Sequence, residues 1–292
     1  MNIIQVYKLF PTEADCIAHL ETVRWQGKPF CPYCSVVGNS TPMPKEQRHH
    51  CNACKTTFSV TIRTIFHHTH LPLQKWFLAV SLILNAKKGI SARQLARDLE
   101  VNKSTAWRMG MQIRKAMAEG AQRQLLQGVV EMDETYVGGK PRKGGGGGAP
   151  KRGRGTRKTP VVGMIQRGGN VKARVVRKDK LKAKSLSALV REHVDVQNAV
   201  LITDEYKGYL GIKYFMPHKT INHQLWYVNG DIHTNGIESF WALLKRRIVG
   251  QYHKVSVRHL PQYLNEFCYR FNHRTTADLF GLTIARAVGA SI

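Results

Sequence analysis

Residues 233–247 read HTNGIESFWALLKRR, and the rest of the chain is organised around them. On a helix of about 3.6 residues per turn, this stretch has two distinct faces. The apolar face, which predicts docking on a core, holds Ile237, Phe240, Trp241, Leu244 and Ile248. The polar face places an amide, a carboxylate and a cation one above the other: Asn235, Glu238, Ala242 and Lys245. A merely solvated face is the ordinary interpretation, unless other carboxylates meet Glu238.

Upstream strands supply such carboxylates. Residues 128–137, GVVEMDETYV, alternate as a strand does and place Glu131 and Asp133 on one face. Residues 199–204, AVLITD, form an apolar run typical of a strand buried on both faces, and the run ends in Asp204. Residues 160–165 and 171–176 predict two more strands, which complete a three-strand antiparallel meander, and residues 183–193 predict a helix. This order of elements indicates an α/β fold with a mixed sheet and flanking helices.

In such a sheet Asp204 lies at the carboxyl end of its strand, where sites form. Singly, a strand-end aspartate is usually a turn or cap residue. Three carboxylates crowded in a chain of net charge +26 need a further reason, and two hard cations held by carboxylate oxygens are the simplest one. Two magnesium ions, with manganese as a substitute, would activate a water or a 3′-hydroxyl and stabilise the leaving oxygen in phosphoryl transfer. We therefore expect Asp133, Asp204 and Glu238 to form a magnesium site.

The charge balance points to a polyanionic partner. Lys and Arg number 45 against 19 for Asp and Glu, and nucleic acid is the first candidate. A ribosomal or histone-like scaffold is usually shorter and poorer in Trp and Tyr. Acidic lipid is a weaker alternative, since no basic amphipathic helix or acylation signal is present. There is neither an apolar run of about 18 residues nor a signal peptide, so a cytoplasmic protein without membrane contact is expected.

Two CxxC pairs stand near the start, Cys31–Cys34 and Cys51–Cys54, with sixteen residues between them. In a cytosolic chain such pairs are better zinc ligands than disulfides, so we predict a zinc ribbon with one structural Zn²⁺. A redox dithiol pair and two disulfides are the alternatives. Thr12 and Asp15 predict a capped helix ahead of the ribbon, running to about residue 24.

Residues 73–85 predict an apolar helix, and the segments that follow predict a helix-turn-helix. Ser91 caps residues 92–99, a short turn follows, and a second helix starts at Lys103. An ordinary helical hairpin is the alternative. On the second helix, the predicted contacts to DNA bases or phosphates are Lys103, Ser104, Thr105 and Arg108.

Residues 138–159 form a Gly-rich, basic loop. A neutral linker would not need this many cations, so an arm that tracks the phosphate backbone fits better. Further DNA contacts are predicted for cations of this loop and for the two arginines that end the helix of residues 233–247. They are Lys140, Arg142, Lys151, Arg152, Arg154, Arg246 and Arg247.

Taken together, these motifs resemble bacterial insertion-sequence transposases of the DDE superfamily, in the group with an N-terminal zinc ribbon. The resemblance covers nearly the whole chain. It rests on Phe10-Pro11, Arg24-Trp25 and the Cys31-Pro32-x-Cys34 knuckle, and on four further stretches: residues 131–139, 203–209, 233–246 and 250–256. It implies a bacterial, nucleoid-associated protein.

The resemblance implies a ribonuclease-H-like catalytic domain that transposes DNA with magnesium. The family's first and second aspartates map onto Asp133 and Asp204. Its third position is Asn or Glu, and this chain offers both Asn235 and Glu238; Glu238 comes first because a carboxylate binds a divalent cation more strongly than an amide. Lys245 would contact a phosphate near the scissile bond.

The predicted domains are an N-terminal helix and zinc ribbon (1–65), a helix-turn-helix region (66–122) and a ribonuclease-H-like domain (123–292). We expect double-stranded DNA partners, namely terminal repeats and target, and a dimer or larger assembly that brings two ends together. Two alternatives remain. A zinc-ribbon and helix-turn-helix regulator would bind DNA without cutting it, and a nuclease of the same fold would cut without joining.

Overall fold

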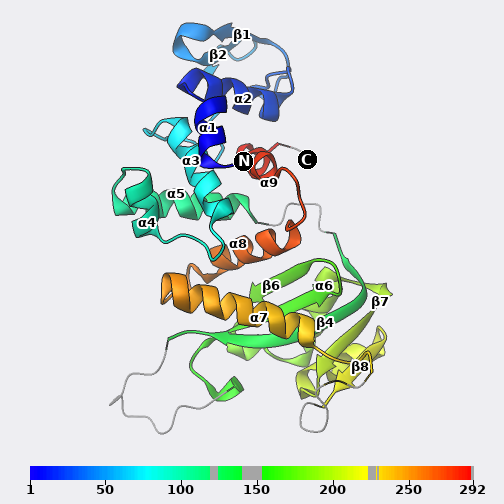
Figure 1. Cartoon of the computed structure of the whole chain (residues 1–292). Coiled ribbons are helices and arrows are strands. Elements are labelled where there is room, and N and C mark those ends of the chain that lie inside the picture. Colours follow the sequence, from blue (N-terminus) through cyan, green and yellow to red (C-terminus); the bar gives the residue numbers. More distant parts are fainter. Residues whose placement is uncertain (119–123, 140–152, 223–227, 229, 291–292) are drawn as a thin grey trace. The chain divides into compact units, whose positions relative to one another are not determined.

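The structure, a computed structural model, describes residues 1–118, 124–139, 153–222, 228 and 230–290 (Figure 1). The chain divides into two compact units, one made of Met1–Ala118 with Thr275–Ile292 and the other of Glu119–Arg274. Within the described part of the chain, every helix is too short or too polar to span a bilayer.

The first unit combines helices with a small antiparallel sheet. Its helices are α1 (Ile3–Leu9), α2 (Glu13–Trp25), α3 (Leu73–Asn85), α4 (Ala92–Asp98), α5 (Lys103–Ala116) and α9 (Leu279–Val288). Its strands pair in the order β1 (Ser40–Met43), β2 (Arg48–Cys51) and β3 (Thr57–Phe58).

Side-chain caps set the helix starts in this unit. Thr12 and Asp15 form the capping box that begins α2. The Ser91 hydroxyl accepts from the backbone N–H of Gln94 at the start of α4, and the Asn102 side chain accepts from that of Thr105 at the start of α5. The helix, turn and helix predicted at residues 92–114 are therefore confirmed.

Helix α9 belongs to the first unit, although the predicted catalytic domain ran to residue 292. The Phe280 ring lies 5.8 Å from that of Phe77 and 6.5 Å from that of Phe10, and the Ile65 N–H donates to the Ala287 carbonyl at 3.2 Å. The apolar face of α9 completes a core whose other residues come from the N-terminal segment. The second compact unit therefore ends at Arg274, inside the range of the predicted catalytic domain.

The second unit is built on a mixed five-stranded sheet. Its strands are β4 (Leu126–Val137), β5 (Thr159–Gln166), β6 (Val171–Val175), β7 (Val194–Asp204) and β8 (His218–Ile221). They lie in the order β6-β5-β4-β7-β8; β4, β5 and β6 form an antiparallel meander, and β7 and β8 run parallel to β4. The predicted meander and the mixed α/β sheet with flanking helices are confirmed.

Helices cover both faces of this sheet (Figure 1). On one face, α6 (Ala183–His193) buries Leu186 and Val190 in a core with Met132 and Met164. On the other face, α7 (Asn235–Arg247) packs on β4 and β5, and α8 (Leu260–Asn272) packs on β6. A 3₁₀ segment, η4 (Lys207–Tyr214), follows β7. Residues 235–247 thus form a helix docked by its apolar face, as predicted.

A glycine in β5 lets α7 approach the sheet. A Cβ added at Gly163 would lie 2.4 Å from Cη2 of Trp241 and 3.1 Å from Cδ1 of Ile237. The Trp241 ring is nearly fully buried, so it has no free space into which to move.

We predict that Gly163→Ala destabilises the second unit by about 1–3 kcal/mol, because overpacking a filled core forces α7 outward. Chemical denaturation measures the loss. Gly211→Ala is the matched control, since its added Cβ meets only an ordinary contact, 3.5 Å from the Ser187 hydroxyl. Equal stabilities of the two variants would contradict the close approach.

Candidate functional site

Four cysteines of the first unit form a compact cluster. The Sγ atoms of Cys31 and Cys54 are 3.6 Å apart, as are those of Cys34 and Cys51, and all four lie within 4.8 Å of one another. Disulfide sulfurs would be about 2.05 Å apart. A tetrahedral Zn–S₄ site with bonds of about 2.3 Å has edges of about 3.8 Å, so the cluster fits zinc.

The strands that carry this cluster are anchored on α2. The His49 imidazole contacts the Glu21 carboxylate at 3.0 Å and packs edge-on against the Trp25 ring at 4.9 Å. The Phe58 ring stacks on His49 at 5.7 Å and also contacts the Trp25 ring at 5.8 Å. His49, which adjoins Cys51, is thus occupied by packing, and the four cysteines remain the ligand set.

In the second unit, strand register sets Asp133 beside Asp204. Strands β4 and β7 run parallel, with Glu131 paired to Ile202 at the last bridged position. Two residues further along each strand come Asp133 and Asp204, which share one face because side chains alternate. That face is the one covered by α7, since the Trp241 Nε1–H donates to Asp133 Oδ2 at 3.1 Å.

Asp133 lies in an unfavourable place for a negative charge. Burial raises the pKa of its carboxyl to about 7, and the charges of Glu134, Asp204 and Glu238 act in the same direction. Asp204 accepts a hydrogen bond at Oδ1 from the Tyr206 backbone N–H at 3.1 Å. The two strand aspartates and Glu238 of α7 therefore share one electrostatic environment.

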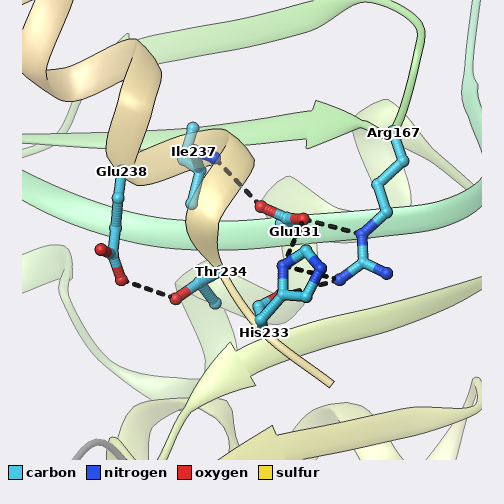
Figure 2. Close-up of polar contacts among 6 residues, drawn as sticks. All are labelled: Glu131, Arg167, His233, Thr234, Ile237 and Glu238. Carbon is cyan, nitrogen blue, oxygen red and sulfur yellow. Dashed lines mark hydrogen bonds and ion pairs between the residues drawn. The ribbon is translucent and has the colours of Figure 1, made fainter. Parts of the chain in front are cut away.

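The first turn of α7 presents the two candidates for the third position. The Thr234 hydroxyl donates to Glu238 Oε1 at 2.9 Å (Figure 2). The Oδ1 atom of Asn235 is buried and has no hydrogen-bond partner among the described residues. A buried carbonyl oxygen without a donor suits a cation or a water held by one.

These oxygens fit a hard divalent cation by their chemistry: each is a carboxylate or amide oxygen, and a cation would relieve the repulsion that raises the pKa of Asp133. Among the residues that the structure describes, only the cysteine cluster brings three ligand atoms of Cys, His, Asp or Glu within 4.8 Å. Asp133, Asp204 and Glu238 therefore interact electrostatically, and their role as a magnesium site stays a prediction.

Two other acidic residues of β4 are already engaged. The Glu134 carboxylate accepts from the Tyr209 hydroxyl at 2.6 Å. The Glu131 carboxylate, 0 % exposed, pairs with Arg167 and with the start of α7. The alternation in β4 placed Glu131 beside Asp133, but nothing in the local sequence indicated that partners distant in the chain would hold it.

The predicted DNA contacts differ in their surroundings. On α5, Lys103, Ser104 and Arg108 are exposed and Thr105 is half-buried, and Lys245 and Arg246 of α7 are exposed. Arg247 is half-buried, and its guanidinium lies over the Phe267 ring of α8, 5.4 Å from the ring centroid. Four loop residues and the side chain of a fifth lie outside the described residues: Lys140, Arg142, Lys151, Arg152 and Arg154.

Two family models match the chain. One, described as an ISXO2-like transposase domain, matches residues 125–272. The other, described as a transposase zinc-ribbon domain, matches residues 11–57. The first match spans every strand of the second unit together with α6, α7 and α8, and the second spans α2 and all four clustered cysteines.

One relative is an uncharacterized protein in the transposable element ISH50 of Halobacterium salinarum. It is 32% identical over 278 residues, which are 90% of this chain and 92% of the relative. Among solved structures, the Mos1 strand transfer complex is 11% identical with a TM-score of 0.30, covering 73% of this chain and 75% of that one. A pre-cleavage Mos1 transpososome is 14% identical with a TM-score of 0.28, covering 73% and 78%. TM-scores this low add nothing to the family matches.

We predict that Cys34→Ser reduces bound zinc from about one ion per chain to near zero, because a structural site needs all four thiolates. Metal analysis of the purified protein measures this, and hydrogen exchange should show loss of protection in residues 31–58. Cys268→Ser, which changes a cysteine of α8 outside the cluster, is the control and should keep its zinc. Full zinc occupancy in Cys34→Ser would rule out the four-cysteine site.

Asp133 also predicts a pH dependence of stability. Its pKa of about 7 in the folded chain exceeds the ordinary 3.8, so the native state binds more protons than the unfolded state between about pH 4 and 7. The free energy of unfolding therefore falls as pH rises through that window. Asp133→Asn removes the ionisation and keeps an acceptor for Trp241. Without added divalent metal it should exceed wild type in stability at pH 8, by up to about 4 kcal/mol, and by less at pH 5.

Urea unfolding at the two pH values measures the difference. Asp195→Asn is a control of opposite sign, because a hydrogen bond from the Asn198 side chain lowers the pKa of Asp195, and its loss should destabilise the protein at pH 8. If the stability of wild type and that of Asp133→Asn depend on pH in the same way, the pKa of Asp133 is not raised in the folded chain.

Proposed function

Because this chain belongs to the ISXO2-like transposase family, we propose that it cuts DNA at the ends of an insertion sequence and joins the freed 3′-hydroxyl to target DNA. Both steps would use one site with two divalent cations. The observation that carries this proposal is the placement of Asp133 and Asp204 on neighbouring parallel strands, facing the helix that supplies Glu238.

Within this proposal Asp133, Asp204 and Glu238 hold the cations. When bound, Mg²⁺ activates the attacking oxygen and stabilises the leaving one. In cleavage, a water oxygen bonds to phosphorus, the bond from phosphorus to the 3′-oxygen breaks, and a 3′-hydroxyl is left. In joining, that hydroxyl attacks a target phosphodiester and displaces the target's own 3′-oxygen. Asp133 must lose its proton to bind a cation, so its raised pKa favours activity at neutral or higher pH.

Asn235 stands beside this group as an outer ligand or as the third member itself. Its buried, unpartnered Oδ1 supports a part in the site. Lys245, two turns after Glu238 on the polar face of α7, is exposed and suits a contact to the phosphate next to the scissile bond.

DNA is the partner that the charge and the helix-turn-helix favour. The net charge is +26, and α5 starts with exposed polar and basic residues behind its Asn102 cap. In our proposal α5 and the zinc ribbon recognise the terminal repeats, the basic loop tracks the backbone, and Arg246 adds a phosphate contact. A dimer or larger assembly brings two ends together.

The proposal predicts the activity of three variants on DNA that carries the element's ends. With Mg²⁺, Asp204→Ala and Glu238→Gln should each lose more than about 100-fold in both cleavage and joining, because each removes a metal ligand. Asn235→Ala should lose about 10–100-fold if it is an outer partner. A gel assay of cleaved and joined products measures all three, and a larger loss for Asn235→Ala than for Glu238→Gln would make Asn235 the third ligand.

The same assay separates the alternatives. Cleavage by wild type without joined product would make the protein a nuclease of this fold. Specific binding without nicking would make it a DNA-binding regulator. Equal activity of wild type and Asp204→Ala would remove the acidic site from the mechanism altogether.

A further inference from the structure

A fully buried carboxylate lies two residues before Asp133 on the same face of the sheet. Glu131 is 0 % exposed in the middle of β4, opposite Ile165 of β5 and Ile202 of β7. A charge in such a place is costly unless it is paired and hydrogen-bonded. The proposed chemistry gives this carboxylate no part, so its partners indicate what it does.

Both oxygens of Glu131 are occupied (Figure 2). Oε1 accepts from Arg167 Nε at 2.8 Å and lies 3.4 Å from His233 Nδ1. Arg167 also holds His233 directly, since its Nη2 donates to the His233 carbonyl at 3.0 Å. We call Glu131, Arg167 and His233 the α7 entrance clamp. It joins β4, the β5–β6 turn and the residue two before α7.

The second oxygen acts on the helix itself. Oε2 accepts from the Ile237 backbone N–H at 3.0 Å. That amide belongs to the first turn of α7, where backbone donors have no partner within the helix, and Thr234 makes no side-chain cap to them. Glu131 is therefore a helix cap supplied by a strand, with its negative charge at the positive end of the helix dipole.

The fit between cap and helix depends on a glycine. A Cβ added at Gly236 would lie 2.8 Å from Glu131 Oε2, closer than real Cβ contacts come. The carboxylate can thus reach the Ile237 amide only because the residue before it has no side chain.

We propose that the α7 entrance clamp is a positioning device for the metal-binding residues, an inference that rests on the function proposed above. Its anchored atoms adjoin the site on both sides: Ile237 is followed directly by Glu238, and Glu131 is followed by Asp133 two residues later. Since side chains on a helix turn by about 100° per residue, holding the Ile237 amide sets the direction in which Glu238 leaves the helix. Glu131 acts through α7 and is not itself a ligand, because both its oxygens are taken.

Two substitutions test the clamp from its two sides. Glu131→Gln keeps the shape and an acceptor for Ile237 but removes the charge that holds Arg167. Gly236→Ala changes none of the three clamp residues, but its added Cβ pushes the Glu131 carboxylate away from α7. Gly211→Ala is the matched control, with ordinary contacts around its added Cβ. All are made in the zinc-loaded full chain.

Two readouts are taken well below the melting temperature. One is hydrogen exchange of residues 235–241, and the other is the affinity for Mn²⁺ alone, measured by calorimetry with Asp204→Ala as the blank. Both clamp variants should exchange at least about tenfold faster in this segment and bind Mn²⁺ about 10–100-fold more weakly, the usual loss when an outer-shell partner is removed. Gly211→Ala should match wild type in both.

A merely structural role would lower the melting temperature and leave Mn²⁺ affinity at the wild-type value, and that result overturns the inference. So does unchanged exchange of residues 235–241 in both clamp variants. If wild type binds Mn²⁺ no better than Asp204→Ala, the proposed metal site fails, and with it the reason for a positioning device. Faster exchange would then leave Glu131 as a helix cap only.

Discussion

Helix α7 can lie against the sheet because β5 has no side chain at residue 163. The Trp241 ring fills that space, and its Nε1–H reaches Asp133 on the neighbouring strand. The same helix carries Asn235, Glu238 and Lys245 on its polar face. The close approach of α7 to β5 therefore fixes the position of Trp241 relative to Asp133. It also fixes where Asn235 and Glu238 lie relative to that aspartate. Most of the acidic site follows from this contact.

The local charge around Asp133 opposes that of the whole chain. A net charge of +26 suits a polyanion, yet the α7 face of the sheet gathers carboxylates and buries one of them enough to raise its pKa to about 7. Such crowding destabilises the protein until something positive shares the space. Glu131 shows the other solution to the same problem, because its negative charge is offset by an arginine and a helix end. Two carboxylates on one strand thus differ: the charge of Glu131 is offset by partners within the chain, whereas burial and neighbouring carboxylates raise the pKa of Asp133.

Local patterns were enough for most of the fold. The caps at Thr12 and Ser91, the alternation around Asp133 and the apolar run before Asp204 each depend on a few adjacent residues, and the corresponding elements lie where they were predicted. What could not be predicted depends on pairs far apart in the sequence. Glu131 meets Arg167 and Ile237 across 36 and 106 residues, and no local pattern selects those partners. Gly163 is the exception, because a glycine inside a strand is a known sign of close backbone approach.

Other features depend on packing between surfaces that look alike in sequence. The apolar face of α9 suits any core, and only the match with Phe10 and Phe77 assigns it to the first unit. Arg247 reads as one more cation of a basic run, but the ring of Phe267 below it engages its guanidinium. A charge count cannot tell a DNA contact from a cation that packs on a neighbouring helix.

The assignment of α9 to the first unit has a consequence for how the chain folds during synthesis. The second unit is an insertion within the first: the segment with Phe10 and Phe77 leaves the ribosome early, and Phe280 follows only after the sheet of the second unit is complete. Until α9 is synthesised, the aromatic core of the first unit therefore lacks Phe280. A chain interrupted after Arg274 would hold an intact acidic sheet beside an unfinished zinc-binding unit. The first unit can thus be completed only after the whole second unit has been synthesised.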